Sequence, residues 1–281
     1  MTLLGQFSLW VALLLGAWAT VVSFSGRWQD RPLGERGSFD VDDEAVEAAI
    51  SRTRQSSETK MSEGDALSVL QAYRIPVTPW RVVPEQECES AADELGYPLA
   101  LKIVSPDIVH KTEFGAVVLG IESATQLREK LDAALAEVRR RFPGQPPRIR
   151  GILLQKMAPA GREIIAGLTR VPRVGPMVMF GLGGIYVEAL RDVSLRMCPI
   201  TDEDAREMVR EVKMHRLLEA IRGEPARDVD ALADVLLRLS QLAIRHPAIS
   251  EMDVNPLVSL PKGAVAVDAR IQLASPPAPQ S

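Results

Sequence analysis

Cysteine is scarce in this sequence, and positive charge is not in excess. Two cysteines occur among 281 residues, Cys88 and Cys198, and they lie far apart without C-x-x-C spacing. They indicate neither a disulfide framework nor a zinc site, and they fit a reducing compartment. The formal net charge is −4, so bulk electrostatics do not indicate nucleic acid as a partner. Hydrophobic residues at 46% and charged residues at 25% match an ordinary globular protein.

Charged side chains are missing altogether from residues 1–26. This apolar run is long enough to cross a bilayer, and basic residues appear only after it, which predicts a cytoplasmic C-terminal side. We therefore expect residues 3–24 to anchor a cytoplasmic domain to the inner membrane. One alternative is a cleaved signal peptide with an A-x-A site at residues 17–19, although the basic n-region is absent. A second alternative starts the protein at Met61, with the upstream segment belonging to another gene.

The folded domain is predicted to span residues 61–275. The polar segment at residues 27–60 is typical of a linker, with one short helix around Asp43–Ser51. Ser62 and Asp65 match a capping box in front of an amphipathic stretch, which indicates that compact structure begins there. After the domain, we expect residues 276–281 to form a disordered tail.

Within this domain, apolar runs alternate with helical periods. The stripe formed by Leu127, Leu131, Leu135 and Val138 predicts a helix capped by Ser123. Two more helices are predicted at residues 202–213 and 228–245. Short β-rich runs predict strands at residues 99–104, 117–121, 149–157, 163–169, 176–180, 186–190, 252–260 and 264–268. The fold class is therefore α+β or α/β, with mixed strands.

A lysine and a histidine accompany the strand predicted at residues 99–104. Lys102 lies inside it, where a charge is costly unless it meets an anion. The alternative is a lysine whose ammonium group reaches the surface. His110 follows in a loop, where a histidine is usually just solvated, but neutral imidazole is also a nucleophile toward phosphoryl groups near neutral pH.

Glycines 181, 183 and 184 form the second candidate for a functional site. Glycine lets backbone N–H groups approach an oxygen-rich ligand, as phosphate-binding nests require. The segment is neither a Walker loop, because no G-K-[ST] follows, nor a dinucleotide-binding fingerprint, because a β-rich run follows instead of a helix. A glycine turn in a hairpin is the alternative interpretation.

Oxygen-bearing side chains gather near the C-terminus. Glu251, Asp253 and Asn255 alternate along a predicted strand and so share one face. Asp268 is predicted on the strand that pairs with it. Carboxylate and amide oxygens converging from neighbouring strands suit Mg²⁺, although the polar exposed face of a hairpin would explain the same pattern.

Taken together, these features resemble the ATP-grasp domain, or β subunit, of ADP-forming acetyl-CoA synthetases and related NDP-forming acyl-CoA synthetases. The resemblance covers residues 62–275 and is carried by three phrases in the right order: LKIVSPDIVHKTE, MFGLGGIYVE and MDVNPL. It implies the ATP-grasp fold, in which two lobes with mixed or antiparallel sheets clamp the nucleotide.

The resemblance also implies roles for individual residues. Asn255 and Asp268 would hold Mg²⁺, and His110 would carry a phosphoryl group between a phosphohistidine of the partner subunit and ADP. Nucleotide contacts would come from seven residues: Lys102, Gln155, Met157, Glu163, Gly183, Gly184 and Arg196. Ala116 departs from the family pattern, because it replaces the second glycine of a pair beside the histidine loop.

By this resemblance the chain is the ATP-binding subunit of an ADP-forming acyl-CoA synthetase, a ligase that uses ATP/ADP and Mg²⁺. Nothing in the sequence resembles a CoA-binding domain, so we expect an α-type partner subunit that carries the first phosphohistidine and binds CoA and a small carboxylic acid. Two alternatives stay open. The chain could be a different ATP-grasp carboxylate ligase, or a non-catalytic nucleotide-binding module.

Overall fold

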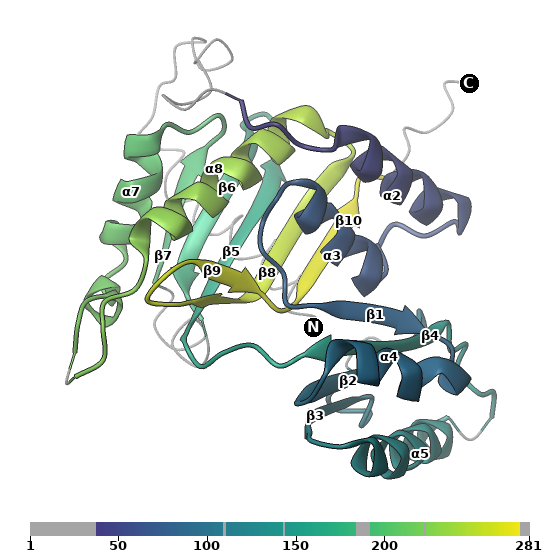
Figure 1. Ribbon diagram of the computed structural model, residues 1–281. Helices are drawn as coiled ribbons and strands as arrows, with labels where there is room; N and C mark the ends of the chain where they lie inside the picture. Colours follow the sequence, from purple (N-terminus) through teal and green to yellow (C-terminus); the bar gives the residue numbers. More distant parts are fainter. Residues whose placement is uncertain (1–37, 109–110, 143, 184–191, 222, 276–281) are drawn as a thin grey trace, which may run out of the picture.

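The computed structural model describes residues 38–108, 111–142, 144–183, 192–221 and 223–275. These residues form a larger and a smaller lobe (Figure 1). No helix within the described ranges is long and apolar enough to cross a membrane. Several sequence predictions lie outside the described residues: the transmembrane helix at 1–26, the tail at 276–281, the strand at 186–190, His110 and Gly184.

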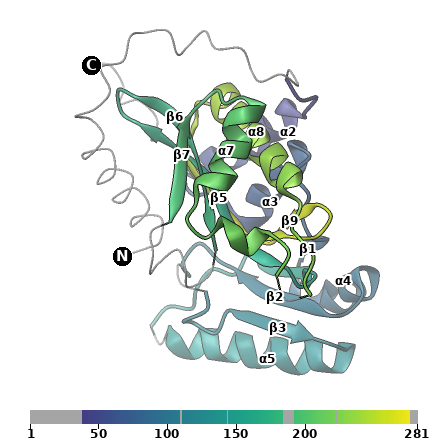
Figure 2. The same ribbon diagram turned by 90° about the vertical axis from the view of Figure 1, so that its left-hand side faces the viewer.

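The small lobe is a four-stranded antiparallel sheet covered by two helices. The strand order is β1-β4-β2-β3, and Figure 2 shows α5 lying along the outer side of this lobe. The elements are β1 (Trp80–Val83), a short 3-10 turn η1 (Glu85–Glu87), α4 (Cys88–Leu95), β2 (Leu99–Val104), β3 (Val117–Ile121), α5 (Ala124–Arg141) and β4 (Gly151–Lys156).

Helix α5 forms for the reasons that its sequence predicts. The Ser123 side chain accepts a hydrogen bond from the backbone N–H of Gln126, which satisfies one of the free donors at the helix start. The predicted stripe from Leu127 to Val138 is buried against the sheet. Three arginines in the last turn complement the negative end of the helix dipole.

The large lobe is a six-stranded antiparallel sheet with helices on one face. The order is β10-β8-β5-β6-β7, with β9 paired to β8, and α7 and α8 cross in front of the sheet in Figure 1. The strands are β5 (Arg162–Val171), β6 (Gly175–Leu182), β7 (Val193–Met197), β8 (Ile249–Ser259), β9 (Ala264–Ala266) and β10 (Ala269–Leu273). The helices are α2 (Asp43–Gln55), α3 (Glu63–Ala72), α7 (Asp202–Glu211), the 3-10 turn η2 (His215–Leu218) and α8 (Val229–Arg245).

The protein has two apolar cores, and the larger one extends from the large lobe to Val104 and Leu153 of the small-lobe sheet. The core of the large lobe joins α2, α3, α7 and α8 to one face of the sheet and includes Cys198. The core of the small lobe joins α4 and α5 to the other sheet and includes Cys88. Both cysteines are free and buried. The two thiols therefore lie in separate cores as small apolar groups.

Helix α2 does not lie in a linker. The sequence predicts a short helix around Asp43–Ser51 inside a linker at residues 27–60, whereas α2 extends to Gln55 and is packed into the core of the large lobe. Val46 and Ala49 are fully buried, and Ile50 is 1% exposed. The predicted start of the folded domain at Met61 was too late. Most residues of α2 are polar, so its overall composition resembles that of a linker even though one face of the helix is buried.

The C-terminal strands also differ from the prediction. Residues 252–260 and 264–268 are predicted as a closing hairpin, and β8 and β9 do pair antiparallel. Asp268, however, lies in the link between β9 and β10 rather than on the paired strand. Strand β10 then returns along β8, with Ala269 opposite Val254. Asp268 therefore lies beside β8 because the next strand, β10, pairs with β8, and not because Asp268 itself is on a paired strand.

Candidate functional site

Lys102 lies in the middle of β2 and is only 7% exposed. Its Nζ donates a hydrogen bond to Oε1 of Glu63 at 2.5 Å. Burial by itself would lower the pKa of Lys102, but the negative charges of Asp268 and Glu63 raise it above its ordinary value. The alternative of a surface lysine is therefore wrong, and the ammonium group stays charged inside the protein.

Glu63, the partner of Lys102, is a site residue that sequence reasoning missed. It is the first residue of α3 in the large lobe, and its second oxygen accepts a hydrogen bond from Nζ of Lys111. Burial raises its pKa, but the charges and hydrogen bonds of the two lysines outweigh this and lower the pKa overall. The only sequence signal was an acidic residue after a helix cap, which is too common to identify a site.

The backbones of Asn255 and Asp268 are neighbours, although an unpredicted strand brings them together. The backbone N–H of Asn255 donates to the carbonyl oxygen of Asp268 at 3.1 Å. Desolvation and the nearby charge of Glu63 raise the pKa of the Asp268 carboxyl. A carboxylate whose ionised form is disfavoured in this way would gain from a bound cation.

Asp253 adds a further oxygen on the same strand. It is 7% exposed, and its Oδ1 is buried without a hydrogen-bond partner among the described residues. Burial raises the pKa of Asp253 to about 7, against the opposing charge of Arg270 on β10. Carboxylate and amide oxygens are the ligands that Mg²⁺ prefers, and an orphaned buried oxygen beside Asn255 and Asp268 fits a divalent cation.

A cavity of about 550 Å³ lies where the two lobes meet. Glu63, Lys111 and Asp268 are among its lining residues. Five basic and three acidic side chains line it, which leaves an excess of positive charge: Lys60, Lys111, Arg148, Arg150 and Arg270 against Glu58, Glu63 and Asp268. An oxygen-rich anion that binds together with a metal cation matches both the positive charge and the volume of this cavity.

Gln155 and Met157 lie at the passage from the small to the large lobe. Nε2 of Gln155 donates to Oγ1 of Thr78 and to the carbonyl oxygen of Val267, both at 2.8 Å. Met157 follows β4, and its backbone N–H donates a hydrogen bond to the carbonyl oxygen of Pro98. Gln155 is fully buried, so its contacts join the lobes, and Met157 is the better placed of the two to border a ligand.

The glycine-rich segment uses its backbone for strand pairing. The N–H of Gly183 donates to the carbonyl oxygen of Glu163 at 2.7 Å, so this N–H is not free for a phosphate. A Cβ at Gly183 would lie 2.8 Å from the carbonyl carbon of Glu163. Glycine is therefore required here for the close approach of the end of β6 to β5. The glycine turn of the hairpin alternative lies outside the described residues. The Glu163 side chain is exposed.

Arg196 does not join Lys102, Lys111 and Glu63. It lies on β7 opposite Val178, a core residue on the helix-covered face of the sheet. Its guanidinium donates to Glu211 of α7 and lies 3.7 Å from Glu207. Alternation along β7 thus directs Arg196 toward α7, away from the cavity between the lobes.

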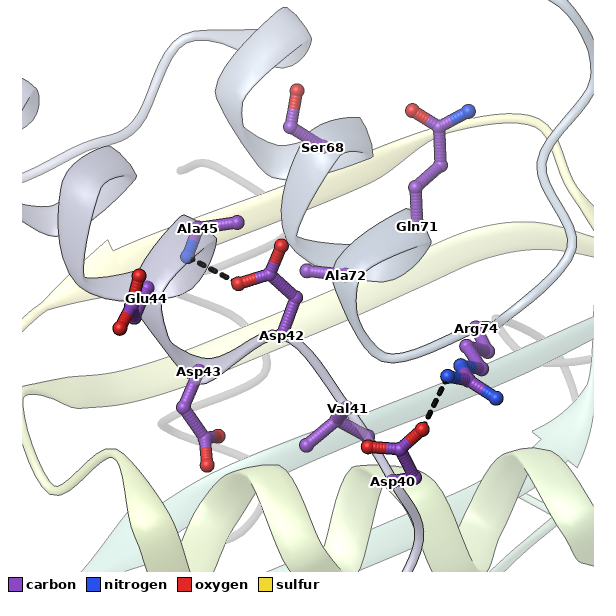
Figure 3. A pocket seen from close by; sticks show the side chains of 10 residues that line it. All are labelled: Asp40, Val41, Asp42, Asp43, Glu44, Ala45, Ser68, Gln71, Ala72 and Arg74. Atoms are coloured by element: carbon purple, nitrogen blue, oxygen red, sulfur yellow. Dashed lines mark hydrogen bonds and ion pairs between the residues drawn. The ribbon is translucent and has the colours of Figure 1, made fainter.

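A second hollow, of about 750 Å³, lies at the start of α2 (Figure 3). Its walls carry four acidic side chains from residues 40–44 and one basic side chain, Arg74. Asp42 caps α2 by accepting from the N–H of Ala45 at 2.9 Å, and Asp40 pairs with Arg74. These contacts explain the acidic residues structurally, and the local negative charge disfavours an anionic ligand.

Comparison with known proteins agrees with this two-lobed architecture. The family model of the ATP-grasp domain matches residues 52–273. The structure of a dinucleotide-forming acetyl-coenzyme A synthetase from Ca. Korarchaeum cryptofilum, in complex with coenzyme A and Ca-AMPCP, is similar with a TM-score of 0.78 and 39% identity. That similarity covers 82% of this chain and 100% of the other.

Two curated relatives are similar at the sequence level. The β subunit of ADP-forming acetate–CoA ligase I from Pyrococcus furiosus is 42% identical over 212 residues, which cover 75% of this chain and 90% of that subunit. ADP-forming acetate–CoA ligase I from Archaeoglobus fulgidus is 42% identical over 259 residues, 90% of this chain. The match spans only 37% of the Archaeoglobus protein. The chain belongs to the ATP-grasp family, in the branch of the ADP-forming acyl-CoA synthetases.

Proposed function

We propose that this chain is the ATP-binding subunit of an ADP-forming acyl-CoA synthetase. The reaction is acid + CoA + ATP to acyl-CoA + ADP + phosphate, and it is reversible. The observation that carries the proposal is that buried Lys102 of the small lobe lies close enough to Asp268 of the large lobe for their charges to interact, and that Asp268 lines a cavity of positive charge. The backbone of Asn255 is hydrogen-bonded to that of Asp268. This arrangement suits a triphosphate held between the lobes.

The residues divide the work of holding the nucleotide. Lys102 binds phosphate oxygens as a buried point charge. Asn255 and Asp268 hold Mg²⁺, which neutralises phosphate charge and orients the terminal groups when bound. Met157 and Glu163 border the adenine at the passage between the lobes, with Gln155 holding that passage in place. Arg196 is not part of this proposal, because its side chain faces α7.

His110 acts as the phosphoryl carrier in this proposal. A neutral imidazole nitrogen attacks the γ-phosphorus of ATP, the bond from that phosphorus to the bridging oxygen breaks, and ADP leaves with the electron pair. The phosphoryl group then passes to a histidine of the partner subunit. His110 itself lies outside the described residues, and this role follows from its place in the motif, next to Lys111.

A partner subunit is part of the proposal. The Pyrococcus relative is named as subunit beta, and a further Korarchaeum structure is described with coenzyme A, acetyl-coenzyme A and a phosphorylated phosphohistidine segment. We infer that an α-type subunit binds CoA and the small carboxylic acid and carries the first phosphohistidine. No comparison supports the predicted membrane anchor, and the proposal does not depend on it.

The test is phosphoryl transfer from γ-labelled ATP to the full-length chain in the presence of Mg²⁺. We expect acid-labile, base-stable label that disappears in His110→Ala. The matched control is His215→Ala, because His215 on η2 is one of only three histidines and lies in another part of the fold. Full-length protein is needed, since a start at Met61 would remove α2 from the core.

The outcomes separate the alternatives. Label that survives in His110→Ala would contradict the histidine relay. An acyl phosphate without phosphohistidine would favour a different ATP-grasp carboxylate ligase. Binding of ATP without any transfer, even with a CoA-binding partner subunit present, would favour a non-catalytic nucleotide-binding module.

A further inference from the structure

One buried carboxylate, that of Glu63, joins the two lobes at the proposed phosphate site. Glu63 begins α3 in the large lobe and is 8% exposed. Its Oε1 accepts from Lys102 at 2.5 Å, and its Oε2 accepts from Lys111. Both lysines belong to the small lobe. The two ammonium groups are therefore held side by side, one on each oxygen of a single carboxylate.

The position of Glu63 is fixed by its neighbours on both sides. The backbone N–H of Asp65 donates to Oγ of Ser62 at 3.1 Å, which caps the helix start. Gly64 lies directly against β1, where an added Cβ would be 3.2 Å from Cγ2 of Val82. The start of α3, and with it the backbone of Glu63, is thus held against the small lobe.

Stability alone is a poor explanation for this cluster. Removing charges from water is expensive, and well-packed apolar residues in place of a buried ion pair are often neutral or stabilising. Lysine is also a flexible side chain that loses rotamer entropy when it is held in one place. Two ammonium groups share the carboxylate of Glu63 beside the cavity that Glu63 and Lys111 line, and with Asp268 counted this cavity still has five basic side chains against three acidic ones.

We propose that Glu63 is a positioning residue for the triphosphate of the bound nucleotide. It holds the ammonium groups of Lys102 and Lys111 side by side at the lobe boundary, so that each ammonium group keeps further N–H donors for phosphate oxygens. The inference rests on the proposed function, because it takes Lys102 as a phosphate ligand. It adds that Lys111 and the large-lobe residue Glu63 belong to the same binding unit.

The test is the affinity of Glu63→Gln for a non-hydrolysable ATP analogue with Mg²⁺, measured by calorimetry on the full-length chain. The amide keeps the size of the side chain but accepts from only one lysine and turns its NH₂ toward the other. We expect affinity to fall by about tenfold or more, as for loss of a hydrogen bond to a charged group. Adenosine, observed by saturation-transfer NMR, should bind as it does to the wild type, because it lacks the phosphates.

Two further variants sharpen the result. Glu89→Gln makes the same chemical change in the ion pair between Glu89 and Arg128 at 2.6 Å, which does not line the cavity, and it should leave analogue affinity unchanged. Lys111→Met should weaken analogue binding, and its effect should not add to that of Glu63→Gln, because both act through one cluster. Lys111→Met leaves the Glu63–Lys102 pair intact, so it tests the cluster even if Glu63→Gln folds poorly.

Unchanged or tighter analogue binding by folded Glu63→Gln would overturn the inference, because Glu63 would then be a bystander or a competitor of the phosphates. Equal losses for adenosine and the analogue would also overturn it, since they would indicate general damage to the site. These results differ from failure of the proposed function, in which the wild-type chain itself binds no Mg²⁺·ATP.

Discussion

At the scale of single residues, the site depends on charges that the fold buries. Lys102 is held by Glu63, and Asp268 stands near both with a raised pKa. Each charge is tolerable only because the others are present, since an unpaired buried charge costs several kcal/mol. When one of these residues is substituted, the effect on nucleotide binding is therefore expected to depend on which of the neighbouring charges remain.

Asp268→Ala tests the metal role at this scale. The variant should bind Mg²⁺·ATP far more weakly than the wild type, while metal-free ATP binding changes little, because the carboxylate acts on the cation. Calorimetry with and without EDTA measures both. Asp234→Ala on α8 serves as the control, since Asp234 pairs with Arg238 and does not line the cavity. Equal losses with and without Mg²⁺ would contradict the metal role.

At the scale of elements, the helix with a clear apolar stripe and the mainly apolar runs were predicted well, and the short strands of mixed composition poorly. Helix α5 lies where its apolar period places it, and strands β2 and β3 lie where short apolar runs predict strands. Strands β1, β7 and β10 are only four or five residues long. Strand β3 is equally short but is an uninterrupted run without polar side chains, whereas charged or polar residues interrupt β1, β7 and β10. Strand β10 is identified only by its pairing with β8.

Helix α2 gives a prediction at this scale. Ile50→Ala should lower the free energy of unfolding by about 2–5 kcal/mol, because Ile50 is 1% exposed and the smaller side chain leaves a cavity. Urea denaturation of the full-length chain measures this loss. Arg54→Ala, on the exposed side of the same helix, should change stability by less than about 0.5 kcal/mol. Similar, small effects of both variants would show that α2 is not part of the cooperative fold.

At the scale of the whole molecule, the two lobes meet at a boundary that combines apolar contacts, through Val104 and Leu153, with charged and polar ones. The contacts across it include Glu63 with Lys102 and Glu58 with Arg150 at 2.6 Å. Gln155 adds hydrogen bonds to Thr78 and Val267. A nucleotide that binds phosphates to one lobe and metal ligands to the other should therefore stabilise the entire chain, because it bridges both cores.

Thermal unfolding measures this effect. Mg²⁺·ATP at about 100 times its Kd should stabilise the folded state by about 2.7 kcal/mol. For a chain of this size, that corresponds to a rise in Tm of about 5–10 °C. Lys102→Met should abolish most of the rise at the same nucleotide concentration, while Glu89→Gln should retain it. A wild-type Tm that does not respond to Mg²⁺·ATP would contradict a binding site between the lobes.

The sequence by itself determined the family, the order of the main elements and the candidates Lys102, Asn255 and Asp268, because local motifs and periodic patterns carry that information. Only the tertiary structure decided which of them meet. It placed Glu63 against Lys102 from 39 residues away in the chain, turned Arg196 toward α7 and assigned the Gly183 N–H to strand pairing. These outcomes depend on strand register and on contacts between lobes, which no local pattern encodes.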